Sequence, residues 1–446
     1  MKKYESVLKP VGRIFGGANL PHCKNTAEMQ SVRIPPPDTV CFPLKQHIGV
    51  VCEACVKVGD SVMVGTKIAD SESPLSSPIY SSVSGTVKSI APVMTASGDS
   101  VQAITVESDG NMQIDFRLKP PVIKNYKDVI NAARNCGLVG LGGAGFPTHI
   151  KLSPAADENI DTLIVNGAEC EPYVTSDYRE CMENFDDIVE GVYLLKDLFG
   201  FKKVIIAIEN NKPAAIKKLY DLASDCRDSD DTVKLMKLKT RYPQGAEKTL
   251  VYTTTKRIIP FGKLPADVGC VIMNITSIST LYRYIKTGIP LVEKRITVDG
   301  DGINEPKNVI VPIGTSLGYL LDFCGGVKEN ADKIIMGGPM MGSAVENTDI
   351  PITKPNNSVL VLENKPCAPT TPCIRCGRCV RACPIRLTPA AVETALRVNN
   401  IGMLKSQNVN YCIECGSCSF VCPAKRPLTQ AMRTAKNIVR RNDLGK

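Results

Sequence analysis

Eight cysteines near the C-terminal end of the chain occur at spacings suited to metal clusters. Cys373-x2-Cys376-x2-Cys379-x3-Cys383 is followed by proline, and the pattern recurs as Cys412-x2-Cys415-x2-Cys418-x3-Cys422, again before proline. Three closely spaced thiolates can bind one face of a 4Fe–4S cluster, while the fourth cysteine of such a run binds the other cluster. The duplicated segment therefore predicts two 4Fe–4S clusters and a role in electron transfer.

This crossed arrangement predicts two ligand sets. One cluster is expected on Cys373, Cys376, Cys379 and Cys422, and the other on Cys412, Cys415, Cys418 and Cys383. Structural zinc is the alternative, but zinc sites usually pair two Cys-x2-Cys hooks and need no third cysteine at equal spacing. Cys52-x2-Cys55 has neither a second pair nor a βαβ context, so free thiols are favoured there.

A glycine-rich loop, Gly140 to Lys151, contains a literal G-x-G-x-x-G. That pattern marks a dinucleotide site only after a strand and before a helix, whereas here a helical stretch precedes it and Pro147 interrupts the segment after it. Glycines nevertheless let backbone N–H groups approach a phosphate or a flat ring closely. With Lys151 as a nearby cation, the loop predicts a binding site for such a group.

The next apolar strand ends in Asn166-Gly-Ala-Glu169-Cys-Glu171-Pro. Together with Gly-x-Gly-Gly-Ala-Gly-Phe-Pro-Thr-x-x-Lys, this stretch resembles the NADH- and FMN-binding flavoprotein subunit of respiratory complex I. With the β-prone segment before it and the twin cysteine runs after it, the whole chain is similar to the RnfC proteins of the Rnf complexes, the membrane-bound ferredoxin–NAD oxidoreductases. From the residues alone, Glu169 and Glu171 could instead cap a helix N-terminus.

The resemblance implies a role for each matching residue. For NADH it implies stacking on Phe146 and hydrogen bonds from the ribose or carboxamide to Glu171. Two positions depart from the family pattern, with Leu141 in place of an arginine and Ala168 in place of an acidic residue, which leaves the hydrogen bonding to the flavin open. For FMN it implies Gly140, Gly142, Gly143, Lys151, Asn166, Glu169, Gly245, Glu247, Asn274 and Thr276.

The segments before the glycine loop differ in pattern. Residues 1–39 contain Gly16-Gly17 and three consecutive prolines without helix or strand periodicity, and indicate an extended N-terminal arm. Residues 40–118 form short β-prone runs that resemble the lipoyl or biotinyl barrel-sandwich domain. The turn that carries the lysine in that family holds serines here, from Ser76 to Ser84, so we expect a scaffold without a covalent cofactor.

The rest of the chain predicts a multidomain α/β protein. Residues 121–290 alternate helices (128–135, 186–199) with strands (162–166, 203–208), which indicates a Rossmann-like layer domain with a parallel sheet, the FMN- and NADH-binding domain of the resemblance. Residues 291–345 resemble a β-grasp soluble-ligand-binding module, 346–366 are expected to be a proline-rich linker, and 367–446 are expected to form a helical ferredoxin-like domain with the twin clusters.

The composition is that of a globular protein whose positive charge is concentrated at one end. The 446 residues are 43% hydrophobic and 22% charged. Residues 363–446 hold 14 Lys and Arg against 4 Asp and Glu, whereas the other 362 hold 40 against 41. Such a segment suits anionic clusters and an acidic protein partner. Nucleic-acid binding is disfavoured because aromatic residues are few and no recognition motif is present.

The sequence shows neither a transmembrane run of about 18 apolar residues nor a secretory signal, and its cysteine usage favours a reducing compartment. The resemblance implies a peripheral subunit on the cytoplasmic face of the membrane. It would pass electrons between NADH or NAD⁺, FMN and two 4Fe–4S clusters, beside membrane and ferredoxin-binding subunits, in a complex that drives ion translocation. Two alternatives are a soluble FMN and iron–sulfur cobalamin reductase of a metabolic microcompartment and a non-catalytic cluster-carrying subunit.

Overall fold

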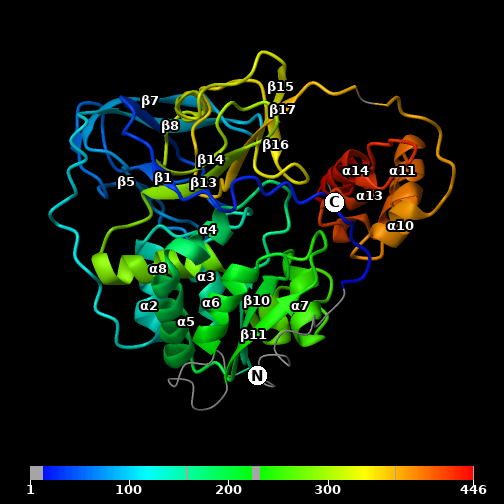
Figure 1. The fold of residues 1–446 in the computed structure, drawn as a ribbon, viewed down its shortest axis with the longest axis horizontal. Helices are drawn as coiled ribbons and strands as arrows, with labels where there is room; N and C mark the ends of the chain where they lie inside the picture. The colour runs from blue at the N-terminus through cyan, green and yellow to red at the C-terminus, as the bar shows by residue number, and fades with distance from the viewer. Residues whose placement is uncertain (1–13, 157–158, 224–231, 367, 445–446) are drawn as a thin grey trace.

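The computed structural model of the chain describes residues 14–156, 159–223, 232–366 and 368–444. Residues 1–13 of the predicted arm lie outside this range. An all-β part and a second sheet lie over an α/β layer, and the C-terminal helices stand to one side (Figure 1). This order along the chain follows the order of the predicted segments.

The N-terminal module is built from two antiparallel sheets that bury alternate apolar side chains such as Phe42 and Ile104. One sheet has the order β2 (Thr39–Pro43), β8 (Ser100–Ser108), β7 (Gly85–Met94) and β4 (Ser61–Val62), and the other has β3 (Glu53–Ala54), β5 (Lys67–Asp70) and β6 (Ile79–Tyr80). The predicted small all-β module is therefore confirmed.

The serine-rich turn of this module is buried rather than exposed. Ser76 and Ser77 have no accessible surface. The Lys354 ammonium, itself buried, donates to Ser77 Oγ (3.3 Å), to the Pro78 carbonyl and to the Gly137 carbonyl (2.7 Å). One lysine thus ties the turn to the α/β layer.

The central layer is a parallel sheet, as the sequence predicts. Its order is β11 (Val233–Leu238), β10 (Lys203–Glu209), β9 (Thr162–Gly167) and β12 (Cys270–Asn274). The helices of this layer are α2 (Tyr126–Asn135), α3 (Thr148–Leu152), α4 (Ser176–Glu183), α5 (Phe185–Phe199), α6 (Pro213–Ala223), α7 (Glu247–Thr255) and α8 (Ile275–Thr287), with 3-10 turns η1 (Ser153–Ala156) and η2 (Pro265–Val268).

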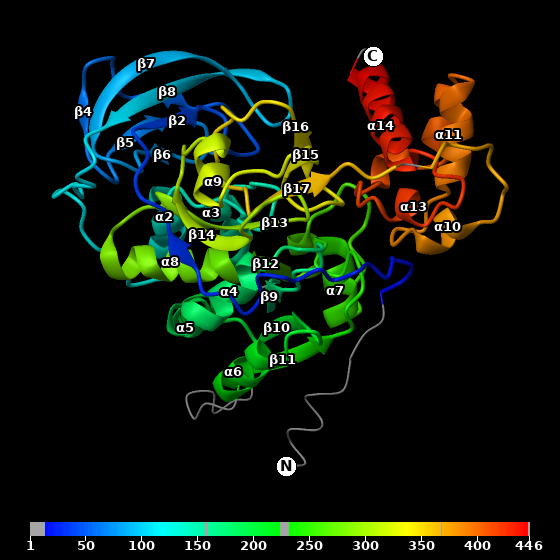
Figure 2. The same cartoon turned by 45° about the horizontal axis from the view of Figure 1, so that its top comes forward.

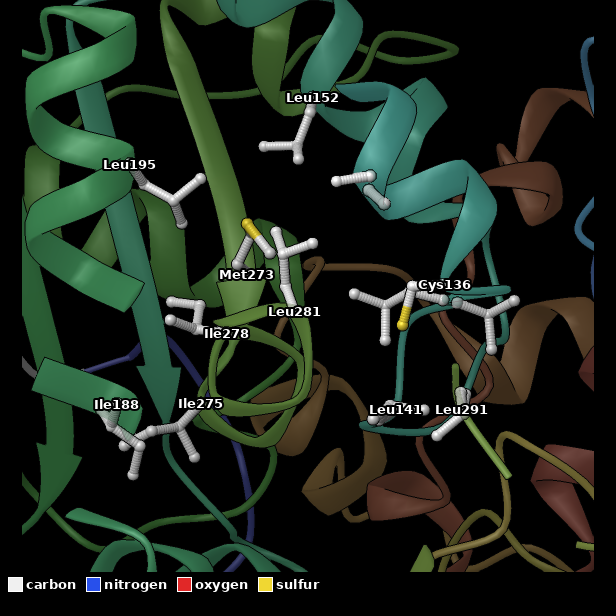
Figure 3. Close-up of a cluster of buried hydrophobic side chains, with 14 of the residues drawn as sticks. Cys136, Leu141, Leu152, Ile188, Leu195, Met273, Ile275, Ile278, Leu281 and Leu291 are labelled. Atoms are coloured by element: carbon white, nitrogen blue, oxygen red, sulfur yellow. The ribbon is translucent and has the colours of Figure 1, made fainter. Parts of the chain in front are cut away.

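The main core of this layer lies between the sheet and helices α2, α3, α5 and α8 (Figure 3). Ile188 from α5 lies beside Ile275 from α8, and Ile278 and Leu281 from α8 and Leu152 from α3 belong to the same cluster. Leu141, at the family's arginine position, is 2% exposed and lies beside Cys136 and Leu291 (Figure 3). This residue therefore belongs to the core.

A six-stranded sheet comes next, and it corrects two expectations. Its order is β1 (Val32–Arg33), β14 (Lys307–Pro312), β13 (Glu293–Asp299), β17 (Ser358–Glu363), β15 (Ala331–Met336) and β16 (Ser343–Val345), with helix α9 (Leu317–Phe323). The predicted linker over 346–366 is wrong at 358–363, because the apolar run of β17 inserts between β13 and β15. The arm also contributes a short strand, β1, which pairs with β14.

The C-terminal part is helical, as expected, with a small core of its own around Val392 and Met432. It contains α10 (Arg378–Ala382), α11 (Pro389–Arg397), α12 (Ile401–Ser406), η3 (Val409–Tyr411), α13 (Ser417–Phe420) and α14 (Leu428–Leu444). Figure 2 shows these helices beside the body, at the end of a long connection from β17. Within the described ranges, no helix is long and apolar enough to cross a membrane.

Candidate functional site

Most of the residues expected to hold FMN gather at the carboxyl edge of the parallel sheet. Asn166 is the next-to-last residue of β9 and Asn274 is the last of β12, and the two are paired in register. A Cβ on Gly142 would lie 3.3 Å from Asn274 Nδ2, so the glycine loop passes directly over that strand end. The carboxyl edge of an open parallel sheet is where ligands bind in such folds.

The glycine loop forms an open cradle. Gly140 N–H donates to the Phe146 carbonyl (2.8 Å), which closes the loop, while Gly142 and Gly143 are exposed. Gly143 has φ +138° and nothing within 4 Å of its Cβ position, so its backbone faces open space. The bare backbone is the surface that a phosphate or a flavin ring requires, and the site therefore fits the group.

The expectation that Pro147 interrupts the structure after the loop is wrong. Helix α3 begins at Thr148, directly after Pro147, which is its N-cap residue. Proline suits the start of a helix because its missing N–H is not needed there. The element before the loop is helix α2, as predicted. A Rossmann fingerprint requires a strand at that position, so the loop does not have the Rossmann arrangement.

Two further predicted residues form an ion pair at the edge of the cradle. Lys151 Nζ lies 2.6 Å from Glu247 Oε1, which joins α3 to the first turn of α7. Because Glu247 is exposed, this pair is weak, and Lys151 can exchange it for an anionic ligand.

The Asn166 side chain binds the backbone of Gly245. Asn166 Nδ2 donates to the Gly245 carbonyl (3.0 Å), and its Oδ1 accepts from Ala168 N–H (3.1 Å). A Cβ on Gly245 would lie 2.3 Å from the Ala168 carbonyl oxygen, so only glycine fits. The Asn166 amide therefore holds the two sides of the site together.

Asp177, which carried no signal in the sequence, clamps two of the predicted residues. Its carboxylate accepts from Asn274 Nδ2 (2.8 Å) and from Thr276 Oγ1 (2.6 Å). Asn274 Oδ1 caps helix α8 through the N–H groups of Thr276 and Ser277. Asp177 lies almost 100 residues from these partners, so only the folded sheet reveals the contact.

A buried lysine, also missed from the sequence, supports the glycine loop from β13. Lys294 Nζ donates to the Leu141 carbonyl (3.0 Å) and to the Lys354 carbonyl (2.7 Å). Burial lowers the pKa of Lys294 to about 7, with the Asp177 carboxylate opposing that shift. The β-grasp sheet thereby contributes directly to the shape of the loop.

Glu169 lies at the N-terminus of helix α4. Its carboxylate accepts from Asp177 N–H (2.8 Å) and approaches Lys212 Nζ (3.7 Å) and Lys24 Nζ (4.0 Å). Burial raises the pKa of Glu169, and the two lysines oppose that shift. The bond from the Asp177 N–H, in the first turn of α4, agrees with the alternative that Glu169 caps a helix N-terminus.

Glu171 has a different environment, between three parts of the chain. Its carboxylate accepts from Met340 N–H (3.0 Å) and from the Tyr242 hydroxyl (3.2 Å). A Cβ on Gly338 would lie 2.4 Å from that carboxylate, so the β-grasp loop can approach only as glycine. Burial raises the pKa of Glu171 to about 7. Among the described interactions, none joins this carboxylate to the half-buried Phe146.

A polar hollow is lined by residues of the N-terminal arm and of the acidic stretch, the name used here for Glu169 to Glu171. The carboxylate of Glu209 lies on its wall and is fully buried without a hydrogen-bond partner. The hollow is lined by Asn19, Leu20, Pro21, His22 and Lys24 of the arm and by Glu169, Cys170, Glu171, Pro172, Glu209, Asn211, Thr240, Arg241 and Tyr242.

Four cysteines, here named the inner cysteines, line one hollow in the C-terminal part: Cys383, Cys412, Cys415 and Cys418. Burial raises the pKa of Cys418 to about 12, and the three other thiols add to that rise because they are close. Backbone N–H groups point at the sulfurs, from Leu387 to Cys383 (3.2 Å) and from Glu414 to Cys412 (3.3 Å). Sulfur ligands with N–H donors fit a 4Fe–4S cluster.

The remaining four cysteines, named the outer cysteines, are more accessible: Cys373, Cys376, Cys379 and Cys422. Cys373 and Cys376 are exposed, while Cys379 is buried. Arg375 N–H donates to Cys373 Sγ (3.4 Å), which repeats the bond from Glu414 to Cys412 in the inner set. The duplicated sequence thus repeats the same N–H to sulfur bond in both sets, although Cys373 is exposed and Cys412 is half-buried.

The inner cysteines face the α/β layer. A Cβ on Gly416, next to Cys415, would lie 3.1 Å from the carbonyl oxygen of Met340, whose N–H binds Glu171. The Tyr411 ring, next to Cys412, stacks on Phe261 with ring centroids 3.7 Å apart. Met340 therefore lies between Glu171 and Gly416, the neighbour of Cys415 in the chain.

Four family models match the chain in the order of its parts. They are the RnfC barrel sandwich hybrid domain at residues 12–111, the Nuo51 FMN-binding domain at 133–283, the SLBB domain at 295–344 and the 4Fe-4S dicluster domain at 370–426. The third of these is the β-grasp module expected from the sequence.

Among solved structures, an NAD⁺-reducing [NiFe]-hydrogenase in its H₂-reduced state has a TM-score of 0.50 at 17% identity, covering 70% of this chain and 61% of that one. At that identity the likeness concerns the fold alone.

Curated relatives match over most of their lengths, and all three described here are RnfC-type subunits. The one from the proton-translocating ferredoxin:NAD(+) oxidoreductase complex of Clostridium ljungdahlii is 40% identical, covering 85% of this chain and 83% of the relative. The one from the Na(+)-translocating complex of Acetobacterium woodii is 38% identical, covering 96% and 97%. The one from the ion-translocating oxidoreductase complex of Rhodobacter capsulatus is 38% identical, covering 93% and 80%. The chain belongs to the RnfC family, whose members are subunits of ion-translocating ferredoxin:NAD(+) oxidoreductase complexes.

Proposed function

We propose that this chain is the nicotinamide-oxidising and -reducing subunit of a membrane ferredoxin–NAD oxidoreductase that drives ion translocation. When bound, FMN exchanges a hydride with the nicotinamide and single electrons with 4Fe–4S clusters. The protein supplies placement and electrostatics. The observation that carries the proposal is the run of contacts from Glu171 through Met340 to Gly416, because it joins the nucleotide site to the inner cysteines.

The flavin is held at the cradle over β9 and β12. Gly142 and Gly143 offer backbone N–H groups, Gly140 closes the loop beneath the flavin through its bond to Phe146, and Lys151 leaves its exposed pairing with Glu247 to meet the phosphate. The other expected flavin residues, Asn166, Glu169, Gly245, Asn274 and Thr276, fix the walls of the cradle, since most of their polar atoms already bind one another or Asp177.

NADH is bound at the side of the cradle where the acidic stretch begins. Phe146 stacks against the nicotinamide nucleotide. The Glu171 carboxylate leaves the Met340 N–H to accept from a ribose hydroxyl or the carboxamide. Binding of the substrate is thereby coupled to the β-grasp loop that contacts Gly416.

Each cysteine set binds one 4Fe–4S cluster with crossed ligands. The common hollow of Cys383, Cys412, Cys415 and Cys418 supports this assignment for the inner set. Gly416, beside inner Cys415, approaches Met340, which binds Glu171, whereas Cys373 and Cys376 of the outer set are exposed. The inner cluster therefore exchanges electrons with the flavin site and the outer cluster with a partner.

The partner docks at the outer cysteines. The exposed side chains of Arg375, Arg378 and Arg381 surround them, in the segment that holds the surplus positive charge of the chain. An acidic surface on a neighbouring protein of the complex matches this face in charge. Membrane and ferredoxin-binding subunits of the same complex hold the chain at the cytoplasmic face of the membrane.

Anaerobic reconstitution of the full chain tests the proposal. We expect eight irons and one flavin per chain, and NADH is expected to bleach both the flavin and the cluster absorbance. A preparation with eight irons but no flavin peak and no bleaching would rule out the nicotinamide function. Loss of NADH oxidation in Glu169→Gln, with the clusters intact, would argue against a non-catalytic cluster carrier. The match to the RnfC barrel sandwich hybrid domain favours the membrane complex over a microcompartment reductase.

A further inference from the structure

We propose that the N-terminal segment Phe15–Ala18, here named the strap, is a positioning device that fixes the inner cysteines relative to the flavin site. The inference rests on the proposed function, because it concerns the distance over which electrons pass. The strap lies between the α/β layer and the C-terminal helices in both ribbon views, as the blue segment beside α7 (Figures 1 and 2).

On one side the strap binds the backbone next to an inner cysteine. Gly17 N–H donates to the Ala382 carbonyl (2.8 Å). A Cβ on Gly16, where φ is +64°, would lie 2.7 Å from the Cys383 carbonyl oxygen. The Arg386 guanidinium lies 3.8 Å from the centre of the Phe15 ring. The strap therefore packs against the part of the chain that carries the crossing cysteine.

On the other side the strap binds the wall of the nucleotide site. Ala18 and Tyr242 exchange two backbone hydrogen bonds (2.8 and 3.0 Å), and the Arg241 guanidinium donates to the Gly16 and Gly17 carbonyls. A Cβ on Gly17 would lie 2.5 Å from the Tyr242 carbonyl oxygen. Tyr242 in turn donates to Glu171. The strap thus binds a residue that contacts the acidic stretch.

The Phe15 ring spans the two parts. Its centroid lies 5.2 Å from that of Tyr252 in α7, and the Arg386 guanidinium of the C-terminal part lies over the ring. Contacts of an aromatic ring with a second ring and with a guanidinium are both favourable. Phe15 is nevertheless 45% exposed, so its removal leaves no buried cavity and should not unfold either part.

Such a device is useful because the covalent connection to the cluster domain contains no regular secondary structure in its described part. The described residues between 364 and 376 are exposed and form neither helix nor strand. Apart from the strap, the described contacts include the Phe261–Tyr411 stack and the approach of Gly416 to Met340. Without the strap the cluster domain would be held against the flavin site by fewer contacts, and small displacements of reacting groups have large effects on rate.

The test separates reduction of the flavin from the onward passage of electrons to the clusters. In Phe15→Ala, rapid mixing with NADH should bleach the flavin at the wild-type rate, whereas reduction of the clusters, followed by absorbance and freeze-quench EPR, should slow by about 10- to 100-fold. Phe15→Tyr keeps the ring and should restore the wild-type rate. Phe116→Ala, which removes a 78% exposed phenylalanine elsewhere, is the matched control.

Hydrogen exchange of the cofactor-free chain gives a second measure. The amides of 377–387 should exchange faster in Phe15→Ala and in Gly17→Ala than in wild type, while those of β9 and β12 should be unchanged. If cluster reduction and exchange both match wild type in these variants, the strap has no positioning role. If wild-type clusters are not reduced by NADH at all, the proposed function fails instead, and the two failures are thereby distinguished.

Discussion

Glu171 shows how a single carboxylate can join parts of the chain that lie far apart in the sequence. It is bound by Tyr242 from the α/β layer and by Met340 from the β-grasp loop. The resemblance in the sequence identified Glu171 as a nucleotide ligand. It could not reveal these partners, because they lie about 70 and 170 residues away and are brought together only by the fold.

The raised pKa of Glu171 predicts a pH dependence of NADH binding. Since its pKa is about 7 rather than 4.5, the carboxylate becomes protonated and loses an acceptor as the pH falls below about 7. The KM for NADH should therefore rise below pH 7, and Glu171→Gln should flatten that dependence. A KM that rises equally in both proteins would show that another group is responsible.

The same shift has a consequence for stability. A carboxyl whose folded pKa is raised favours the folded state below its ordinary pKa, and this advantage is lost as the pH rises through the folded value. Stability should thus fall between about pH 4.5 and pH 7 by a contribution that Glu171→Gln abolishes. Denaturant unfolding of both proteins across that range measures it.

Asp177 should control flavin affinity although it was invisible in the sequence. Asp177→Ala removes the acceptor of Asn274 and Thr276, at a cost of about 1 to 3 kcal/mol for groups left without a partner. We expect the flavin to dissociate roughly 10-fold more readily, as measured by fluorescence of released FMN. Asp187→Ala, which removes an α5 carboxylate bound by Arg283, is the control and should retain flavin.

At the scale of elements, the sequence predicted the parallel sheet well because its strands are continuous apolar runs and its helices are amphipathic. Strand β17 was missed because prolines on both sides favoured a linker. Its six residues are mostly buried on both faces, so they lack the alternation of polar and apolar residues that predicts a strand. The assignment of 358–363 to a linker rested on local composition, whereas the strand is stabilised by its two neighbours in the sheet.

The central position of β17 predicts a stability effect that a linker would not show. Val359→Ala removes a fully buried side chain between β13 and β15 and should lower the free energy of unfolding by roughly 2 kcal/mol. Val122→Ala, at a position that is 75% exposed, should change it by less than about 0.5 kcal/mol. If the two substitutions had equal effects in urea titrations, residues 358–363 would behave as a linker and not as a central strand.

At the scale of the whole molecule, the positions of the cysteine sets predict an order of electron flow. Cys376→Ser disrupts the outer cluster, and NADH should still reduce the inner one at the wild-type rate. Cys415→Ser disrupts the inner cluster and should leave the outer one unreduced on the same timescale. EPR after rapid freezing distinguishes the two, and fast reduction of the outer cluster in Cys415→Ser would reverse the proposed order.

The buried turn of the barrel-sandwich module has an implication for how such domains change use. In the lipoyl and biotinyl families that the module resembles, this turn must be free so that a modifying enzyme can reach it and a tethered group can travel. Here Lys354 reaches the turn from the opposite side and binds Ser77, Pro78 and Gly137. The substitution Ser77→Lys would therefore not restore a modifiable carrier. In this chain the turn is a fixed part of the interior, and its lysine contact joins it to Gly137, three residues before the glycine loop.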